Sequence, residues 1–121
     1  MSERGQATVE LALALPLVAG ILLVLVQVGL VVRDQVLTAH AAREAVRAAA
    51  VDDRAGAARS AAVDGSGLDA ERLTVRVGPR GRPGGRVRVE VAYRAPTDVP
   101  LVGPLVGEVT LTAAATMRVE Q

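Results

Sequence analysis

The sequence lacks most of the residues on which catalytic, metal and stacking sites depend. Its 121 residues contain no Cys, no Phe, no Trp, one Tyr and one His. Without Cys there is no disulfide and no Cys-ligated metal, and one His supplies neither a His-based metal cluster nor a triad. Base stacking needs aromatic rings, and a net charge of +1 does not favour a polyanion. We therefore expect no cofactor, no metal, no nucleic acid and no small-molecule substrate.

What the sequence has in excess is one long apolar run. From Leu11 to Val32, 22 consecutive residues carry no charge. A helix of that length spans roughly 33 Å, close to the roughly 30 Å hydrocarbon core of a bilayer. A chain of 121 residues is too small to hide the whole circumference of such a helix. The run therefore predicts one transmembrane helix over residues 11–32.

Two simpler interpretations of the run are a cleaved secretory signal and a plain signal anchor. A cleaved signal has an apolar region of about 7 to 15 residues, so this run is too long for one. The nearest small-x-small site, Ala39-His40-Ala41, lies several residues beyond its end. A plain signal anchor fits the length, but neither interpretation explains the residues that precede the run.

An acidic residue lies at the edge of the apolar run. Glu10 directly precedes Leu11, and a carboxylate at the edge of lipid is costly unless it finds a partner. If the chain were cut after Gly5, the new amino group of Gln6 would lie about one helical turn from Glu10. That amine could neutralise Glu10, or the equivalent Glu of a neighbouring helix.

These features resemble those of type IV prepilins, in which a short charged leader ends in Gly, a Glu follows at the fifth position, and an apolar helix begins. Roughly the first 50 residues are similar to the TadE-like family of minor pilins, the pseudopilins of tight-adherence (Flp) pilus systems. Two positions depart from that pattern. Leu11 lies where an aromatic residue is common, and Gln6 lies where Phe or Met often begins the mature chain. The residues that carry the resemblance are Arg4-Gly5, Val9-Glu10-Leu11-Ala12-Leu13, Leu15-Pro16-Leu17 and Ala41-Ala42-Arg43-Glu44-Ala45-Val46-Arg47.

The resemblance implies a membrane-anchored minor pilin that takes part in assembly of such a pilus, or a related secretion machine, through packing of its N-terminal helix. Residues 1–5 would be a cytoplasmic leader, removed after Gly5 by a prepilin peptidase, and Glu10 would register subunits. Other pilins or pseudopilins and the assembly platform would be its partners. The C-terminal part would be extracytoplasmic. This orientation rests on the resemblance alone, because more Arg residues follow the span than precede it.

Beyond the span the pattern stays helical and then changes. Alanine-rich sequence extends the helix over 6–63, with a weak point near Asp52-Asp53, and Asp64-Gly65-Ser66-Gly67 ends it. A linker is expected over 64–71 and a β domain over 72–121. In that domain apolar and polar residues alternate in three segments, beginning at Leu73, Val87 and Val109.

Three antiparallel strands with one apolar face need a cover, and the exposed half of the long helix is the candidate for it. We therefore predict an α+β, pilin-like fold, with a long N-terminal helix packed on a small sheet of about three strands.

The remaining polar residues favour surface roles over chemistry. No nucleophile with a base, acid pair or metal cage emerges from the sequence, so we expect no enzyme. His40 has no second ligand nearby, and Asp52, Asp53 and Asp64 lack the spacing of a calcium loop. A basic stripe is expected on one sheet face and its hairpin tip, formed by Arg76, Arg80, Arg82, Arg86, Arg88 and Arg94.

Two alternatives remain open from the sequence. The segment Pro100–Gly107, with sequence PLVGPLVG, either tucks against the helix or forms a subunit contact. The whole chain is either a processed pilin or an unprocessed single-pass anchor whose β domain binds an envelope ligand through its arginine face.

Overall fold

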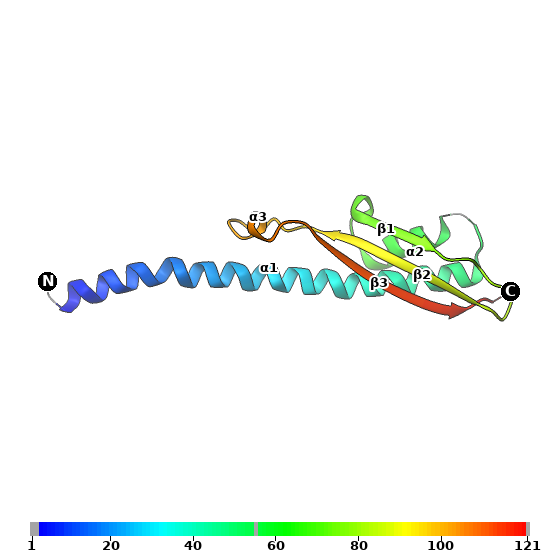
Figure 1. Ribbon diagram of the computed structural model, residues 1–121, viewed down its shortest axis with the longest axis horizontal. Helices are drawn as coiled ribbons and strands as arrows, with labels where there is room; N and C mark the ends of the chain where they lie inside the picture. Colours follow the sequence, from blue (N-terminus) through cyan, green and yellow to red (C-terminus); the bar gives the residue numbers. More distant parts are fainter. Residues whose placement is uncertain (1–2, 55, 121) are drawn as a thin grey trace.

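The computed structural model of the chain describes residues 3–54 and 56–120. The molecule is elongated, because one long helix carries a small head at its C-terminal end (Figure 1). The elements follow in the order α1 (Glu3–Val51), α2 (Ala57–Ser66), the 3-10 helix η1 (Ala70–Arg72), β1 (Leu73–Val77), β2 (Arg86–Ala95), α3 (Gly103–Val106) and β3 (Val109–Arg118).

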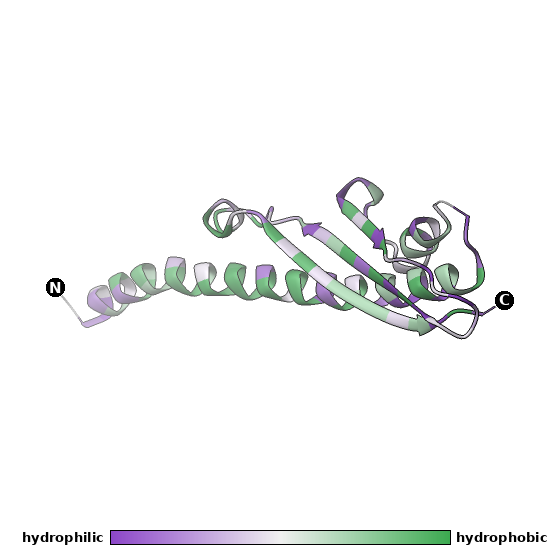
Figure 2. Cartoon of the chain, turned by 45° about the vertical axis from the view of Figure 1, so that its right-hand side comes forward, coloured by the Kyte–Doolittle hydropathy of each residue, from purple (hydrophilic) through white to green (hydrophobic). Residues whose placement is uncertain are grey.

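Helix α1 is continuous over 49 residues, a length of about 73 Å. Pro16 lies inside it without ending it. The half that includes the apolar run extends away from the head, whereas the other half lies beneath the sheet (Figure 2). The same helix therefore passes through two different surroundings.

The helix expected over 6–63 is instead two helices, and that prediction is wrong in its length. Helix α1 ends at Val51, where the Asp52 carboxylate accepts hydrogen bonds from the backbone N–H of Arg54 (2.9 Å) and from its guanidinium (2.6 Å). Gly56 then adopts a φ of 89°, a conformation that glycine reaches without steric cost. The chain turns here, at the expected weak point, and α2 returns along α1.

Helix α2 extends into residues 64–66, the start of the expected linker. It includes Gly65 and ends at Gly67, whose φ is 72° and whose N–H donates to the Val63 carbonyl (3.1 Å). A Cβ on Gly65 would lie 2.8 Å from Cγ of Glu44 on α1. Gly65 therefore permits the close approach of two helices and does not stop the helix.

The three strands form one antiparallel sheet in the order β1-β2-β3. In its register Leu73 pairs with Tyr93, and Val91 pairs with Ala113. The inner face of β2 is almost completely buried, with Val87, Val89 and Val91 at most 1% exposed. This face packs on α1, so the predicted α+β, pilin-like layout is confirmed.

Alanine supplies the helical side of the core. Ala41, Ala45 and Ala50 are fully buried on α1, and Ala62 is fully buried on α2. Small side chains let helix and sheet backbones approach closely, and their packing stabilises the head. The end of the chain closes this core, because the backbone N–H of Glu120 donates to the Ala50 carbonyl (2.9 Å).

Candidate functional site

The N-terminal half of α1 is apolar and uncovered. Most of its large side chains remain open, such as Val9 at 44% exposed and Leu13 at 74%. Only 6% of its most apolar 18-residue window is buried. The core helix of a water-soluble protein would be mostly buried, so this exposure favours a lipid-facing helix. Among the residues the structure describes, α1 is the one helix long and apolar enough to cross a membrane.

A secretory signal is also an apolar N-terminal helix, but the fold argues against cleavage beyond the run. Cleavage at Ala39-His40-Ala41 would cut α1 inside the head, where Ala41 is fully buried. The helix continues unbroken from the apolar run into the core. The apolar run and the head are therefore parts of one folded unit.

The residues of the expected processing site lie in the first turns of α1. Gly5, Gln6 and Glu10 are all helical, and Gln6 and Glu10 are exposed. Their separation of four positions places Gln6 and Glu10 on one side of the helix, about one turn apart. Thr8 Oγ1 donates to the Arg4 carbonyl (2.9 Å) in the same turns. Of the expected leader, residues 1 and 2 lie outside the described part of the chain.

The second group of motif residues divides between core and surface. Ala42 and Val46 are 1% and 2% exposed, against the sheet and α2, whereas Arg43 and Arg47 are exposed. Val9, Leu11 and Pro16, in the first group, lie on the open half of α1 and are all exposed. The two groups therefore lie in different surroundings on one helix.

Sequence reasoning missed Gln27, which is buried within the apolar run. Its side chain is 2% exposed, and its Oε1 accepts a hydrogen bond from the backbone N–H of Val99 (3.4 Å). Among the described residues, its Nε2 has no hydrogen-bond partner. A signal was present, since Gln27 is the only residue between Leu11 and Val32 whose side chain can form hydrogen bonds.

Arg80 does not belong to the expected basic stripe. Its Nη2 donates to the carbonyls of Ala50 (3.1 Å) and Glu120 (3.0 Å), and its Nη1 lies 3.8 Å from Oδ2 of Asp53. It therefore joins the end of α1 to the end of the chain. Local sequence contains no signal for this contact, which depends on the path of the β1–β2 connection.

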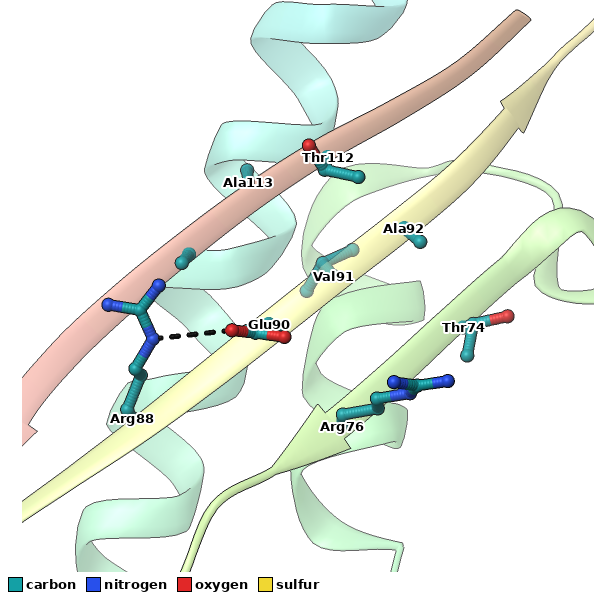
Figure 3. Close-up of a pocket in the computed structure, with 9 residues that line it drawn as sticks. Thr74, Arg76, Arg88, Glu90, Val91, Ala92, Thr112 and Ala113 are labelled. Atoms are coloured by element: carbon teal, nitrogen blue, oxygen red, sulfur yellow. Dashed lines mark hydrogen bonds and ion pairs between the residues drawn. The ribbon is translucent and has the colours of Figure 1, made fainter.

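The arginines expected on β1 and β2 lie on the outer face of the sheet, where Arg76 and Arg88 line a shallow hollow (Figure 3). Arg76 from β1 lies beside the pair formed by Arg88 and Glu90 of β2, whose Nε and Oε1 are 3.4 Å apart. Arg86 and Arg94 are exposed on the same strand. The rest of the lining is formed by small or aliphatic residues: Thr74, Val91, Ala92, Thr112, Ala113 and Ala114.

Two carboxyl groups of the head have perturbed pKa values for opposite reasons. Burial raises the pKa of Asp34, and the nearby Arg33 guanidinium, 3.8 Å away, partly opposes that shift. Hydrogen bonds from Arg54 lower the pKa of Asp52 to about 2. Both groups have structural partners. Within residues 3–54 and 56–120 no three His, Asp or Glu side chains gather into a group that could hold a metal ion.

Fold and surface together fit one class: a single-pass, membrane-anchored protein with a pilin-like α+β head. Comparison with known proteins adds a family likeness over part of the chain. The family model described as TadE-like protein matches residues 5–47, which confirms the resemblance predicted from the sequence. The match and the long apolar helix fit a membrane-anchored protein associated with Tad pili. No curated protein and no solved structure gives a significant match.

Proposed function

We propose that this protein is a minor pilin, or pseudopilin, that takes part in assembly of a tight-adherence pilus through packing of the open half of α1. One observation carries the proposal. The TadE-like match begins at residue 5 and runs through Glu10 and the whole apolar run into the head. Such a helix can lie in lipid before assembly and against other helices afterwards. Its partners are other pilins or pseudopilins and the assembly platform.

The proposal includes cleavage after Gly5 by a prepilin peptidase, with the leader in the cytoplasm and the head outside it. The exposed position of Glu10, one turn after Gln6, supports a pairing between Glu10 and the new amino group. Because a free N-terminal Gln can cyclise, the mass of the mature terminus also reports whether that amine persists.

Intact mass spectrometry of the membrane-extracted protein, expressed with and without a prepilin peptidase, tests processing. We expect a chain that begins at Gln6 only with the peptidase, and loss of that product in Gly5→Ala. Gly20→Ala is the matched control, because a Cβ at Gly20 would meet no atom within 4 Å. An intact terminus under both conditions would contradict processing.

The role of Glu10 needs a separate test, since processing and registering can fail independently. We expect Glu10→Ala to insert into membranes normally but to recover fewer partner pilins in a pull-down. Glu3→Ala, which changes an exposed acid of the leader, is the control. Normal recovery of partners by Glu10→Ala would exclude a registering role.

A second candidate function is a permanently anchored binding module. The outer sheet face favours it, because Arg76, Arg86, Arg88 and Arg94 outnumber the single acid Glu90 on the two strands β1 and β2. Such a face suits an acidic envelope ligand. Under this alternative the chain keeps its leader, so the mass measurement separates the two functions.

A further inference from the structure

The connection between β2 and β3 extends past the sheet toward the transmembrane half of α1 (Figures 1 and 2). We refer to residues 99–107 as the α3 loop. Its sequence, VPLVGPLVG, has no charged residue. Leu101 and Leu105 are 79% and 86% exposed, and Val106 is 46% exposed. Leu101 and Leu105 are the most exposed large apolar side chains among the residues that the structure describes.

The contact with Gln27 sets the level of the α3 loop along the span. The backbone N–H of Val99 donates to Gln27 Oε1. Gln27 lies six positions before Arg33, the first charge after the apolar run, which corresponds to about 9 Å along the helix. The loop is therefore attached at a point inside the lipid-facing run. The contact also pairs the buried side-chain oxygen of Gln27, in keeping with the rule that polar groups in a span face protein.

Most backbone N–H donors of the α3 loop are paired. Its internal donors reach carbonyls of the same loop: Gly103 N–H to Val99, Leu105 N–H and Val106 N–H to Val102, and Gly107 N–H to Gly103, at 2.7–3.2 Å. Pro100 and Pro104 have no N–H to satisfy. Irregular backbone at membrane depth is tolerated where it is buried in protein. The inner side of this loop meets that condition at Val99, which is buried and bonded to Gln27 of α1, and at Val102, which is also buried.

The compact shape of the loop also directs its leucines outward. A Cβ on Gly103 would lie 2.1 Å from the Thr97 carbonyl oxygen, so only glycine fits there. Leu101 has a φ of 69°, in the left-handed region that non-glycine residues rarely adopt. Val99 and Val102 are buried, at 6% and 8% exposed, while Leu101 between them is open. The loop therefore has a packed side and an apolar outer side.

We propose that the outer side of the α3 loop, formed by Leu101, Leu105 and Val106, inserts among the acyl chains of the membrane leaflet nearest the head. The lipid bilayer is the occupant because the loop is attached inside the lipid-facing run, carries no charge and pairs most of its backbone donors. The loop gives the head a second membrane contact, which fixes its height and its rotation about α1. This inference rests on α1 spanning the membrane and is independent of any role in a pilus.

Tryptophan fluorescence of the full-length chain in phosphatidylcholine vesicles tests this inference. Because the natural chain contains no Trp, Leu105→Trp introduces a single indole. We expect blue-shifted emission that is quenched by lipids brominated near the headgroup. Leu22→Trp, in the middle of the span, should be quenched more strongly by lipids brominated near the chain ends. Thr116→Trp, exposed on the head, should resist both.

The controls separate failure of the loop from failure of the span. Quenching of Leu22→Trp without quenching of Leu105→Trp would overturn the loop proposal and leave the span intact. Blue-shifted emission of Leu105→Trp that resists brominated lipids and increases with the protein-to-lipid ratio would show that a second protein covers the loop, which also overturns the proposal. No quenching of Leu22→Trp would overturn the span and the loop together.

Discussion

The two halves of α1 differ in which apolar side chains are exposed and which are buried. In the N-terminal half the large residues Leu, Ile and Val are open, as at Leu17, which is 67% exposed. In the C-terminal half the buried residues are mostly alanines, such as Ala41 and Ala45 at 0%. In water the larger aliphatic side chains would be the ones to bury. The reversal is what a helix shows when lipid surrounds one half and protein surrounds the other.

The two halves therefore require different side chains. Lipid accepts bulky side chains on every face of a helix and accepts polar groups only where protein covers them, as at Gln27. A tight contact with α2 and the sheet needs small residues on one face, with arginines on the other. Four variants test this division, and they are given in order of decreasing effect.

A charge in the lipid-facing half should have the largest effect. Leu22→Arg places a cation near the middle of the apolar run, which costs about 2.5–3.5 kcal/mol in apparent insertion free energy. An insertion assay with the full chain measures the inserted fraction. Val36→Arg, at a position 64% exposed just beyond the run, is the control and should insert as the natural chain does. Equal losses from both variants would contradict the boundary near Arg33.

A larger side chain in the protein-facing half should destabilise the head. Ala45→Leu overfills a fully buried contact, at a cost of about 1–3 kcal/mol in unfolding free energy. Fluorescence of Tyr93, the only Tyr and 4% exposed, follows urea unfolding of the chain in detergent micelles. Ala19→Leu, exposed in the lipid-facing half, is the matched control. An equal urea midpoint for the two variants would argue against a tight alanine contact.

Loss of Arg80 should have a moderate effect. Arg80→Ala removes hydrogen bonds to the Ala50 and Glu120 carbonyls, and we expect a loss of about 1 kcal/mol in unfolding free energy. The same urea titration measures it. Arg82→Ala, exposed in the same connection, should change stability by less than about 0.5 kcal/mol. An equal loss of unfolding free energy in Arg82→Ala and Arg80→Ala would show that the contact of Arg80 with the end of α1 makes no specific contribution to stability.

The turn after α1 should show the smallest effect, as a pH dependence. The Asp52 pKa is lowered from 3.8 to about 2 by Arg54. The carboxylate therefore contributes its stabilisation above the ordinary pKa and loses it as pH falls through about 2. Carboxyl NMR titration of the chain in micelles measures the pKa, which should return toward 3.8 in Arg54→Gln. A pKa near 3.8 for Asp52 before substitution would contradict the pairing.

Sequence periodicity predicted which helices and strands form better than it predicted the residues at which they end. The uncharged run from Leu11 and the alternation around Val89 follow from local pattern, and both are present as a long helix and a sheet. The turn at Asp52 also had a local signal. Gly65, however, is a helix breaker by composition and lies within α2 because Glu44 approaches it. That contact is tertiary, so the local pattern could not contain it.

The candidate functional residues also divide into those with a local sequence signal and those whose contacts depend on the fold. The motif residues from Arg4 to Arg47 were found from sequence, because their signal is local and matches a family model over residues 5–47. The contacts of Gln27 with Val99, and of Arg80 with Ala50, join residues 72 and 30 positions apart. Because such long-range contacts have no local signal, the PLVGPLVG segment has two interpretations from the sequence. Its position beside Gln27 became visible only in the fold.

Solvent accessibility along α1 tests the central division most directly. The natural chain has no Cys, so single-Cys variants in vesicles can be labelled with a water-soluble maleimide from both sides. We predict no labelling on any face over residues 12–30. Over 34–50 we predict a helical pattern, with labelling at Val36, His40 and Arg47 and none at Thr38 or Ala45. A helical pattern of labelling over 12–30 would place that half in water or against protein, and would contradict the account.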